Sequence, residues 1–252
     1  MLLTGDHDRQ GDAAGPVPPV SHNLQGQRLG RKGRDTRERI LAAAHELLAE
    51  PVAPGSTITL SEVARRAKLR VGSLYLYFAD LTELLLALLA PVMEAAENDF
   101  VRLLRPRWSE EALGARTLDL VTAYYAFWVR HSRLLHLRNS MADSLDERML
   151  RHRVRSVQPI MRLLVEQMDG DASRPEPAVA AMATAMMTGL ERVVTVTTDP
   201  NLPLLIRTRD TAGHRQLLEA QARLIELGIQ DCRRRAGGKH NTPGEREEGP
   251  GT

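Results

Sequence analysis

A helical repeat of apolar side chains runs through most of this chain and limits what it can fold into. From about residue 36 to residue 235 apolar residues recur every three to four positions, and no segment alternates in the manner of a half-buried strand. Leu, Ala and Arg are plentiful, whereas aromatic residues make up only 4% of the sequence. This bias favours helices over sheets. With 252 residues the chain can bury a substantial core, so we expect an all-α protein.

Charge and cysteine content narrow the class of protein. The net charge of +2 is too small to indicate a nucleic-acid partner, so a DNA-binding surface would have to be a local patch. The single cysteine, Cys232, excludes an internal disulfide framework and a cysteine-rich zinc site. The longest apolar run, residues 84–93, is about half of what spans a bilayer, and the amino terminus lacks a signal peptide. We expect a cytoplasmic protein with no membrane span, metal or other cofactor.

The two ends of the chain differ from its helical middle. Both are rich in Gly, Pro and charged residues without a helical period. We therefore predict a disordered basic arm over residues 1–34 and a disordered tail over residues 237–252. The basic residues at the inner end of the arm are Arg28, Arg31, Lys32 and Arg34. Between the ends we expect a small helical domain over residues 35–82 and a larger one over residues 83–236.

The small domain is predicted to hold three helices, over residues 36–49, 60–67 and 71–78. Thr59 and Glu62 have the spacing of a capping box at the start of the second helix. Asp80 and Glu83 repeat that spacing at the start of a long fourth helix. Two short helices joined by a tight turn are typical of a helix-turn-helix motif.

The third predicted helix has an unusual outer face. With Leu74 and Phe78 turned inward, the pattern exposes a glycine and two tyrosines together with other small or apolar residues. The exposed set is Val71, Gly72, Ser73, Tyr75, Leu76 and Tyr77. This composition suits a helix in the major groove of DNA, where hydroxyl groups reach phosphates and rings contact thymine methyl groups.

Three segments resemble the DNA-binding region of the tetracycline-repressor (TetR) family of transcriptional regulators. They are residues 36–44 (TRERILAAA), 59–67 (TLSEVARRA) and 71–78 (VGSLYLYF), and Glu83-Leu84 follows closely. The resemblance covers residues 36–85. It implies an amino-terminal helix-turn-helix DNA-binding domain joined to a helical bundle that binds a ligand and dimerises. It also implies a repressor that binds a palindromic operator as a homodimer and is released by a small, largely apolar effector.

The resemblance assigns roles to individual positions. It places Val71, Ser73, Tyr75 and Leu76 nearest to base edges, with Gly72 on the same helix, and Ser61 close to a base or a phosphate. Thr36 and Tyr77 would contact phosphates. Because none of these central residues is Asn, Gln or Arg, we expect methyl contacts and DNA shape to matter more than bidentate base recognition.

Three positions depart from the family pattern. Lys68 stands where the family has a turn glycine, Arg70 stands where it has a Ser or Thr cap, and Leu81 replaces a phosphate-contacting lysine. A side chain in a left-handed turn and a cation at a helix start each cost roughly 1 kcal/mol. We hypothesise that Lys68 and Arg70 contact DNA phosphates, and that Arg31, Lys32 and Arg34 of the basic arm replace the missing lysine.

The larger domain is predicted from helices over residues 117–131, 133–142, 146–168, 177–196 and 211–235. The helix over 177–196 is nearly all apolar, so we expect burial on most of its sides. The last two helices are the candidate dimer surface, although Met182, Met186, Met187, Gly189 and Leu190 fit a single-chain core equally well. Pro91, within the fourth helix, either kinks it as a pivot or ends it.

The ligand pocket implied by the resemblance lies between the middle helices. Its candidate walls are Phe100, Tyr124, Phe127, Trp128, Met141, Met161 and Met168. His131 and His136 are candidate hydrogen-bonding partners of a ligand, although the nearby Arg133 and Arg138 suggest a solvated turn.

Other classes of function are weighed against this interpretation. No phosphate-binding loop, nucleophile signature or metal-spaced histidine cluster occurs, so an enzyme is disfavoured. A helical protein-interaction module and a DNA-binding regulator controlled by a protein partner, or lacking a ligand, remain alternatives.

Overall fold

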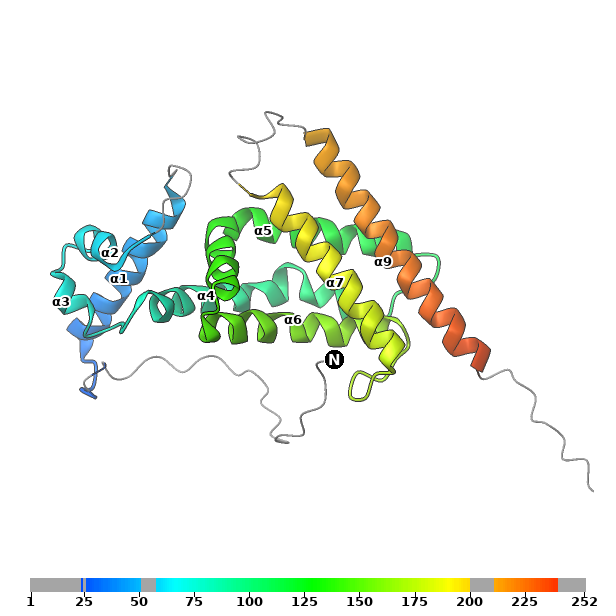
Figure 1. Ribbon diagram of the computed structural model, residues 1–252, viewed down its shortest axis with the longest axis horizontal. Coiled ribbons are helices and arrows are strands. Elements are labelled where there is room, and N and C mark those ends of the chain that lie inside the picture. The colour runs from blue at the N-terminus through cyan, green and yellow to red at the C-terminus, as the bar shows by residue number, and fades with distance from the viewer. Residues whose placement is uncertain (1–23, 25, 51–57, 200–210, 240–252) are drawn as a thin grey trace, which may run out of the picture.

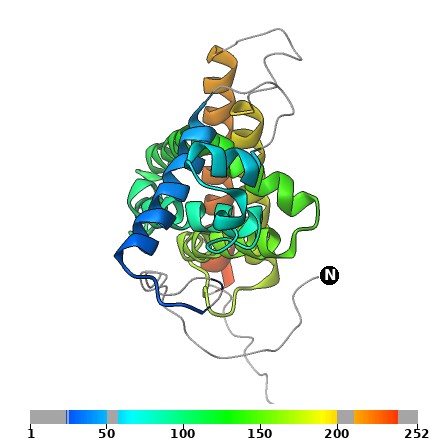
Figure 2. The same cartoon turned by 90° about the vertical axis from the view of Figure 1, so that its left-hand side faces the viewer.

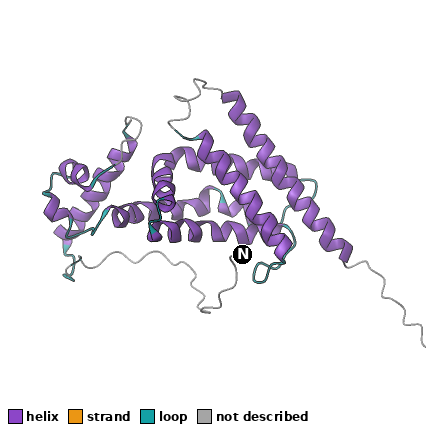
Figure 3. Cartoon of the chain, viewed as in Figure 1, coloured by secondary structure: helices purple, strands orange, loops and turns teal. Residues whose placement is uncertain are grey.

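The computed structural model describes residue 24 and residues 26–50, 58–199 and 211–239. The described part is built from helices joined by loops and turns (Figure 3), so the all-α prediction is confirmed. The elements are α1 (Arg31–Ala49), α2 (Leu60–Arg66), α3 (Val71–Leu74), α4 (Leu81–Asp99), the 3-10 helix η1 (Val101–Leu104), α5 (Leu113–Asp143), α6 (Glu147–Gln167), α7 (Pro177–Thr197) and α9 (Thr211–Lys239).

The helices form two groups joined by α4. Figure 1 shows α1, α2 and α3 at one end of the molecule, and Figure 2 shows this group in front of the rest. Helix α4 leaves the group and packs against α5 and α6 in the larger domain. Helix α9 packs along α5 and α7 on the far side (Figure 1). An amino-terminal helix-turn-helix domain is thus followed by a carboxy-terminal helical bundle.

Both predicted ends of the helical region were placed too far inward. Helix α1 starts at Arg31, so Arg31, Lys32 and Arg34 lie in its first turn and not in a disordered arm. The preceding Leu29 is buried, and its side chain folds back so closely that a Cβ on Gly33 would meet it at 2.8 Å. Helix α1 therefore begins five residues before the predicted start at residue 36, directly after a buried leucine that packs against Gly33. At the other end α9 continues to Lys239, beyond the predicted tail boundary at 237.

Two further helix predictions are corrected. Residues 113–143 form the single helix α5 instead of two segments, and Arg138 is buried within it instead of belonging to a solvated turn. Helix α4 continues through Pro91 to Asp99, so the proline does not end it.

Helix α7 is buried on one face only, contrary to the prediction. Its buried residues are Ala183, Met186, Met187, Leu190 and Val194. The opposite face is exposed and consists largely of small residues. By length and composition α7 is apolar enough to cross a membrane, and 28% of its apolar 18-residue window is buried. One such helix is weak evidence for a membrane span, because helices of soluble proteins can have the same composition.

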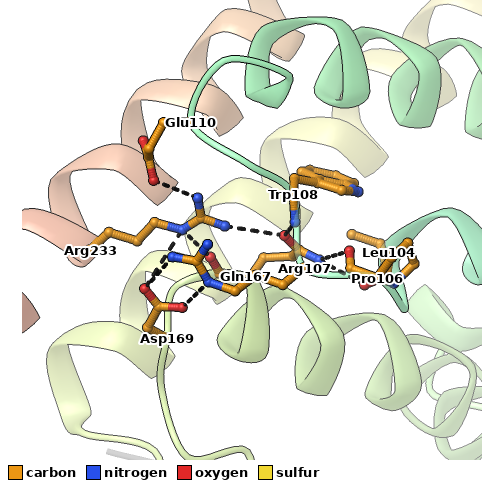
Figure 4. Close-up of polar contacts among 8 residues, drawn as sticks. All are labelled: Leu104, Pro106, Arg107, Trp108, Glu110, Gln167, Asp169 and Arg233. Carbon is orange, nitrogen blue, oxygen red and sulfur yellow. Dashed lines mark hydrogen bonds and ion pairs between the residues drawn. The ribbon is translucent and has the colours of Figure 1, made fainter.

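A polar network holds α9 at the end of the molecule far from α1–α3 (Figure 4). The buried Arg233 of α9 donates from Nε to the Gln167 carbonyl at 2.7 Å, and its Nη1 lies 2.6 Å from Glu110. The Gln167 side chain accepts from the Trp108 N–H and donates to the carbonyls of Leu104 and Pro106. These bonds join α9, the end of α6 and the loop before α5, so the buried guanidinium and amide groups are satisfied.

Candidate DNA-binding surface and ligand cavity

The turn between α2 and α3 is a helix C-terminal motif with a lysine in the glycine position. Lys68 has a φ of 55°, the left-handed conformation expected for this position. The Leu69 N–H donates to the Ala64 carbonyl at 2.8 Å and the Lys68 N–H to the Arg65 carbonyl at 3.1 Å, which is the Schellman pattern. The chain therefore accepts the conformational cost of a side chain at this turn.

The predicted capping box of α2 is present in both directions. The Glu62 N–H donates to the Thr59 hydroxyl at 3.2 Å, and the Thr59 N–H donates to the Glu62 carboxylate at 2.9 Å. At the start of α4 only the forward bond forms. Asp80 accepts from the Glu83 N–H at 2.9 Å, whereas the Glu83 carboxylate accepts from the Ala79 N–H, one residue before the cap.

The candidate recognition helix α3 is short and anchored from within. Regular α-helix ends at Leu74, and tighter turns continue to Phe78, with the Leu76 N–H donating to Ser73 and the Tyr77 N–H to Leu74. Leu74 and Phe78 are fully buried, as the pattern predicts. The Arg37 guanidinium of α1 lies 5.0 Å from the centroid of the Phe78 ring, a cation–π contact that holds α1 against this turn.

The outer face of α3 carries most, but not all, of the predicted exposed residues. Val71 and Tyr75 are 37% and 49% exposed, and Gly72 is also exposed. Ser73 and Leu76 are half-buried. The interpretation of an exposed tyrosine pair is wrong for Tyr77, which is half-buried and packs against the core.

The remaining predicted contact residues surround α3 and the start of α1. Lys68 and Arg70 are exposed beside the turn, and Arg70 makes no capping bond, as expected. Ser61 is exposed in the first turn of α2. The Thr36 hydroxyl donates to the Lys32 carbonyl at 2.8 Å, so its proton is engaged within α1 and its oxygen is left as an acceptor.

The larger domain contains a cavity of about 940 Å³ between α4, α5 and α6. This volume lies within the range of small-molecule sites, which is roughly 300–1,000 Å³. Phe100, Tyr124, Phe127 and Trp128, four of the predicted wall residues, line it. The Phe100 ring packs edge-on against Tyr124 and Phe127, with centroids 4.9 and 5.2 Å away. One side of the cavity is therefore a rigid aromatic wall.

The three methionines predicted for this wall lie elsewhere. Met141 and Met161 are half-buried, Met168 is fully buried at the end of α6, and none of them lines the cavity. Helical period alone places a residue on a buried face, but it does not say whether that face borders a cavity or solid core.

Seven polar cavity residues were not predicted from the sequence: Glu94 and Glu97 on α4, Arg105 after η1, Arg138 on α5, and His152, Arg155 and Ser156 on α6. Arg138 is only 4% exposed, and burial lowers the pKa of its guanidinium. A signal for it was present, since Arg138 shares the helical register of the buried Leu134, Leu135 and Ala142. Arginines are rarely buried without a partner, so an arginine on the buried face of a helix points to a special site.

The two candidate histidines have separate surroundings. The His136 Nε2 lies 3.0 Å from the Thr198 hydroxyl, and its ring is edge-on to Trp128. The His131 ring packs against Phe127 and lines a second cavity of about 580 Å³. Pro91 and residues at the end of α1 also line this second cavity. Burial lowers the pKa of both imidazoles.

Two arginines connect the helix-turn-helix domain to the larger domain. Arg133 of α5 donates to the backbone carbonyls of Leu47, at 2.7 Å, and Glu50, and so caps the end of α1. Arg148 of α6 lies 2.8 Å from Asp80, the cap of α4. The first turns of α4 and α6 are thereby joined.

Comparisons with known proteins support the fold. No family model matches the chain, and no curated protein matches it. A solved structure from Streptomyces coelicolor, described as a tetR-family transcriptional regulator, aligns with a TM-score of 0.56 at 17% identity, covering 88% of this chain and 94% of that one. A TetR family regulator from Marinobacter aquaeolei VT8 aligns with a TM-score of 0.47 at 19% identity, covering 79% and 98%.

The chain thus has the fold of a TetR-family transcriptional regulator. This agrees with the family that the motifs in residues 36–85 resemble.

Proposed function

We propose that this chain is a cytoplasmic, dimeric TetR-type repressor that binds a palindromic operator and is released by a small effector. The observation that carries the proposal is the outer face of α3. Val71, Gly72 and Tyr75 are exposed there, on a helix held from behind by Leu74 and Phe78. An anchored helix with an exposed outer face is what insertion into a major groove requires.

Local charge supports DNA binding by this face. Lys68 and Arg70 directly precede α3 and form no ion pair within the described residues. The basic residues of the first turn of α1 are also exposed; they are Arg31, Lys32 and Arg34. Cations without intramolecular partners are available for phosphates, whose neutralisation supplies most of the non-specific affinity.

Selection of bound sequences from random duplex DNA tests this proposal directly. We expect enrichment of a palindrome whose half-sites are about one helical turn apart. Arg70→Ala should weaken binding to that duplex and reduce the salt slope by about one unit, whereas Arg162→Ala, on the exposed face of α6, serves as the matched control. No enrichment, or equal affinity of wild type and Arg70→Ala at every salt concentration, would argue against DNA recognition by α3.

A second copy of the chain is the proposed partner of α7 and α9. The exposed face of α7 carries Ala181, Thr184, Ala185 and Thr188, and that of α9 carries Leu217, Ala220, Leu224 and Leu227. Both sets follow a helical period of three to four residues, so each forms a continuous stripe. Small residues on one helix and leucines on its neighbour suit a four-helix bundle between two protomers.

The earlier candidates Met186, Met187 and Leu190 belong to the core of the single chain, each at most 5% exposed. Leu224 is 61% exposed, so Leu224→Arg should leave the protomer folded and shift its mass in sedimentation from dimer to monomer. Val129→Arg is the control, since Val129 is also exposed but lies on α5. A monomeric wild type would refute the proposed dimer, and a dimeric Leu224→Arg would place the interface elsewhere.

The cavity between α4, α5 and α6 is the proposed effector site. It meets α4, the helix that continues from the helix-turn-helix domain, through Leu86, Ala90 and Met93. A ligand that fits only one position of α4 shifts the position of the DNA-binding domain. The alternative, a regulator controlled by a protein partner, is distinguished by a screen in which no small molecule raises the melting temperature or releases DNA.

A further inference from the structure

We propose that the effector is an amphipathic carboxylate, with its head group held by Arg138 and Arg155 and its apolar body against the Phe100–Tyr124–Phe127 wall. This inference rests on the proposed effector site and specifies the chemistry of its ligand. It comes from the uneven distribution of polar groups around the cavity.

The aromatic wall is the apolar part of the cavity lining. Phe100, Val101, Tyr124 and Phe127 are all nearly buried, and of these four only Tyr124 carries a polar group. The Glu97 carboxylate on α4 also lines the cavity but is already paired with Arg105 at 2.8 Å, and Glu94 is exposed. The wall formed by Phe100, Val101, Tyr124 and Phe127 therefore suits hydrocarbon or aromatic groups.

Another end of the lining, formed by α5 and α6, is basic. Arg138, His152 and Arg155 line it together with the Ser156 hydroxyl. A second hollow of about 430 Å³ continues from this end, shares His152, Arg155 and Ser156, and is also lined by Arg148 and Arg151. No acidic side chain lines that second hollow. Arg148 and Arg151 are paired with Asp80 and Glu147, whereas Arg155 has no ion pair within the described residues.

Arg138 is incompletely compensated where it lies. Its Nε and Nη2 donate to the Asn139 side chain and its Nη1 to Ser156, all neutral partners at 3.0–3.3 Å. Its nearest carboxylate, Glu191, stays 3.6 Å away, and the buried Oε1 of Glu191 accepts no hydrogen bond in the described part of the chain. A buried guanidinium with donors to spare is a strong ligand for a carboxylate, which it binds in a planar, charge-assisted geometry.

His152 adds a second unsatisfied group at the same end. Its Nδ1 is buried and has no hydrogen-bond partner among the described residues. A carboxylate placed between Arg138 and Arg155 would supply an acceptor for this nitrogen. An apolar ligand without a head group would leave both Arg138 and His152 unsatisfied, which is costly in a buried site.

Isothermal titration of the full-length protein with decanoate, decanol and decylamine tests the proposal, since these probes share one chain and differ in head group. We expect decanoate to bind at least about tenfold more tightly than either of the others, the factor that corresponds to one charge-assisted bond. Arg155→Gln should remove most of that preference. Arg162→Gln, on the same helix but away from the cavity, should keep it.

Arg138→Gln provides a second variant once circular dichroism shows that it is folded. Equal binding of decanoate and decanol, a preference for decylamine, no binding of any probe, or an unchanged preference in both variants would each overturn the proposal. Operator binding is measured on the same samples. If wild type binds the operator but shows no preference for decanoate, the ligand chemistry alone is refuted, whereas absent operator binding by wild type refutes the regulator function.

Discussion

The Thr82 hydroxyl, in the first turn of α4, donates a hydrogen bond to the Asp146 carboxylate at 2.7 Å. Asp146 is also the cap of α6, since it accepts from the N–H groups of Arg148 and Met149. One carboxylate therefore ties the helix that leaves the helix-turn-helix domain to the helix that lines the basic end of the cavity. The hydroxyl of Thr82, together with these cap bonds, lowers the pKa of Asp146.

Thr82→Val tests this connection. Thr82 is 4% exposed, so valine keeps the volume but removes the hydroxyl donor. We expect a loss of about 1–2 kcal/mol in the free energy of unfolding, measured by urea denaturation. The surface variant Thr122→Val on α5 should lie close to wild type. Equal stability of both variants would mean that the bond contributes nothing net.

Lys68→Gly should separate stability from DNA affinity. Glycine removes the left-handed strain at φ 55°, so we expect the melting curve to indicate a gain of up to about 1 kcal/mol. Loss of the cation should at the same time weaken operator binding and reduce the salt slope by about one unit. Lys68→Ala is the matched control, because it removes the charge but keeps the strain. Binding equal to that of wild type in both variants would exclude a phosphate contact by Lys68.

Arg133→Gln should loosen the end of α1. Its guanidinium supplies hydrogen bonds to two carbonyl groups at that end and a positive charge that interacts favourably with the negative end of the helix dipole. We expect a loss of about 1–2 kcal/mol in unfolding free energy and faster amide exchange in the last turn of α1. Arg162→Gln, which removes an exposed arginine on α6 without an ion pair within the described residues, should show neither effect. Unchanged exchange in Arg133→Gln would contradict the capping role.

Gln167→Leu should destabilise the far end of the molecule. The substitution leaves the Trp108 N–H and the carbonyls of Leu104 and Pro106 without their side-chain partner in a buried place. We expect a cost of at least about 2 kcal/mol, measured as a shift of the denaturation midpoint. Gln158→Leu, at an exposed position of the same helix, is the control. If both substitutions cost the same, the network is of no special importance to stability.

His152 should make the protein sensitive to mild acid. Burial, with the charge of Arg138 as a second cause, lowers the pKa of His152 to about 4 from 6.5. The unfolded chain therefore binds more protons than the folded one between these values, so stability falls as the pH drops from about 6.5 towards 4. His152→Gln should lose less melting temperature between pH 7 and pH 5 than wild type, whereas His45→Gln should behave as wild type. An identical pH dependence in wild type and His152→Gln would show that another group is responsible.

Local sequence was sufficient for most of the helix-turn-helix domain. The Thr59–Glu62 box follows from residue spacing, and the inward Leu74 and Phe78 follow from the helical period. The left-handed Lys68 was expected only from the family resemblance. The start of α1 did not follow in this way, because its cap residue Gly30 makes no side-chain capping bond and no capping motif marks the start. The half-burial of Tyr77 likewise reflects a contact with the core that no local pattern contains.

The sequence by itself determined the all-α class, the helix-turn-helix motif and the aromatic register of α5, because periodicity and capping are encoded over short distances. Tertiary structure decided where the helices leave space. It brought Arg138 of α5 beside His152 and Arg155 of α6, left the outer face of α7 uncovered and joined Thr82 to Asp146. The residues joined in these contacts are far apart along the chain, so no local pattern predicts them. Whether a buried helix face meets solid core or a cavity depends on how whole helices cross.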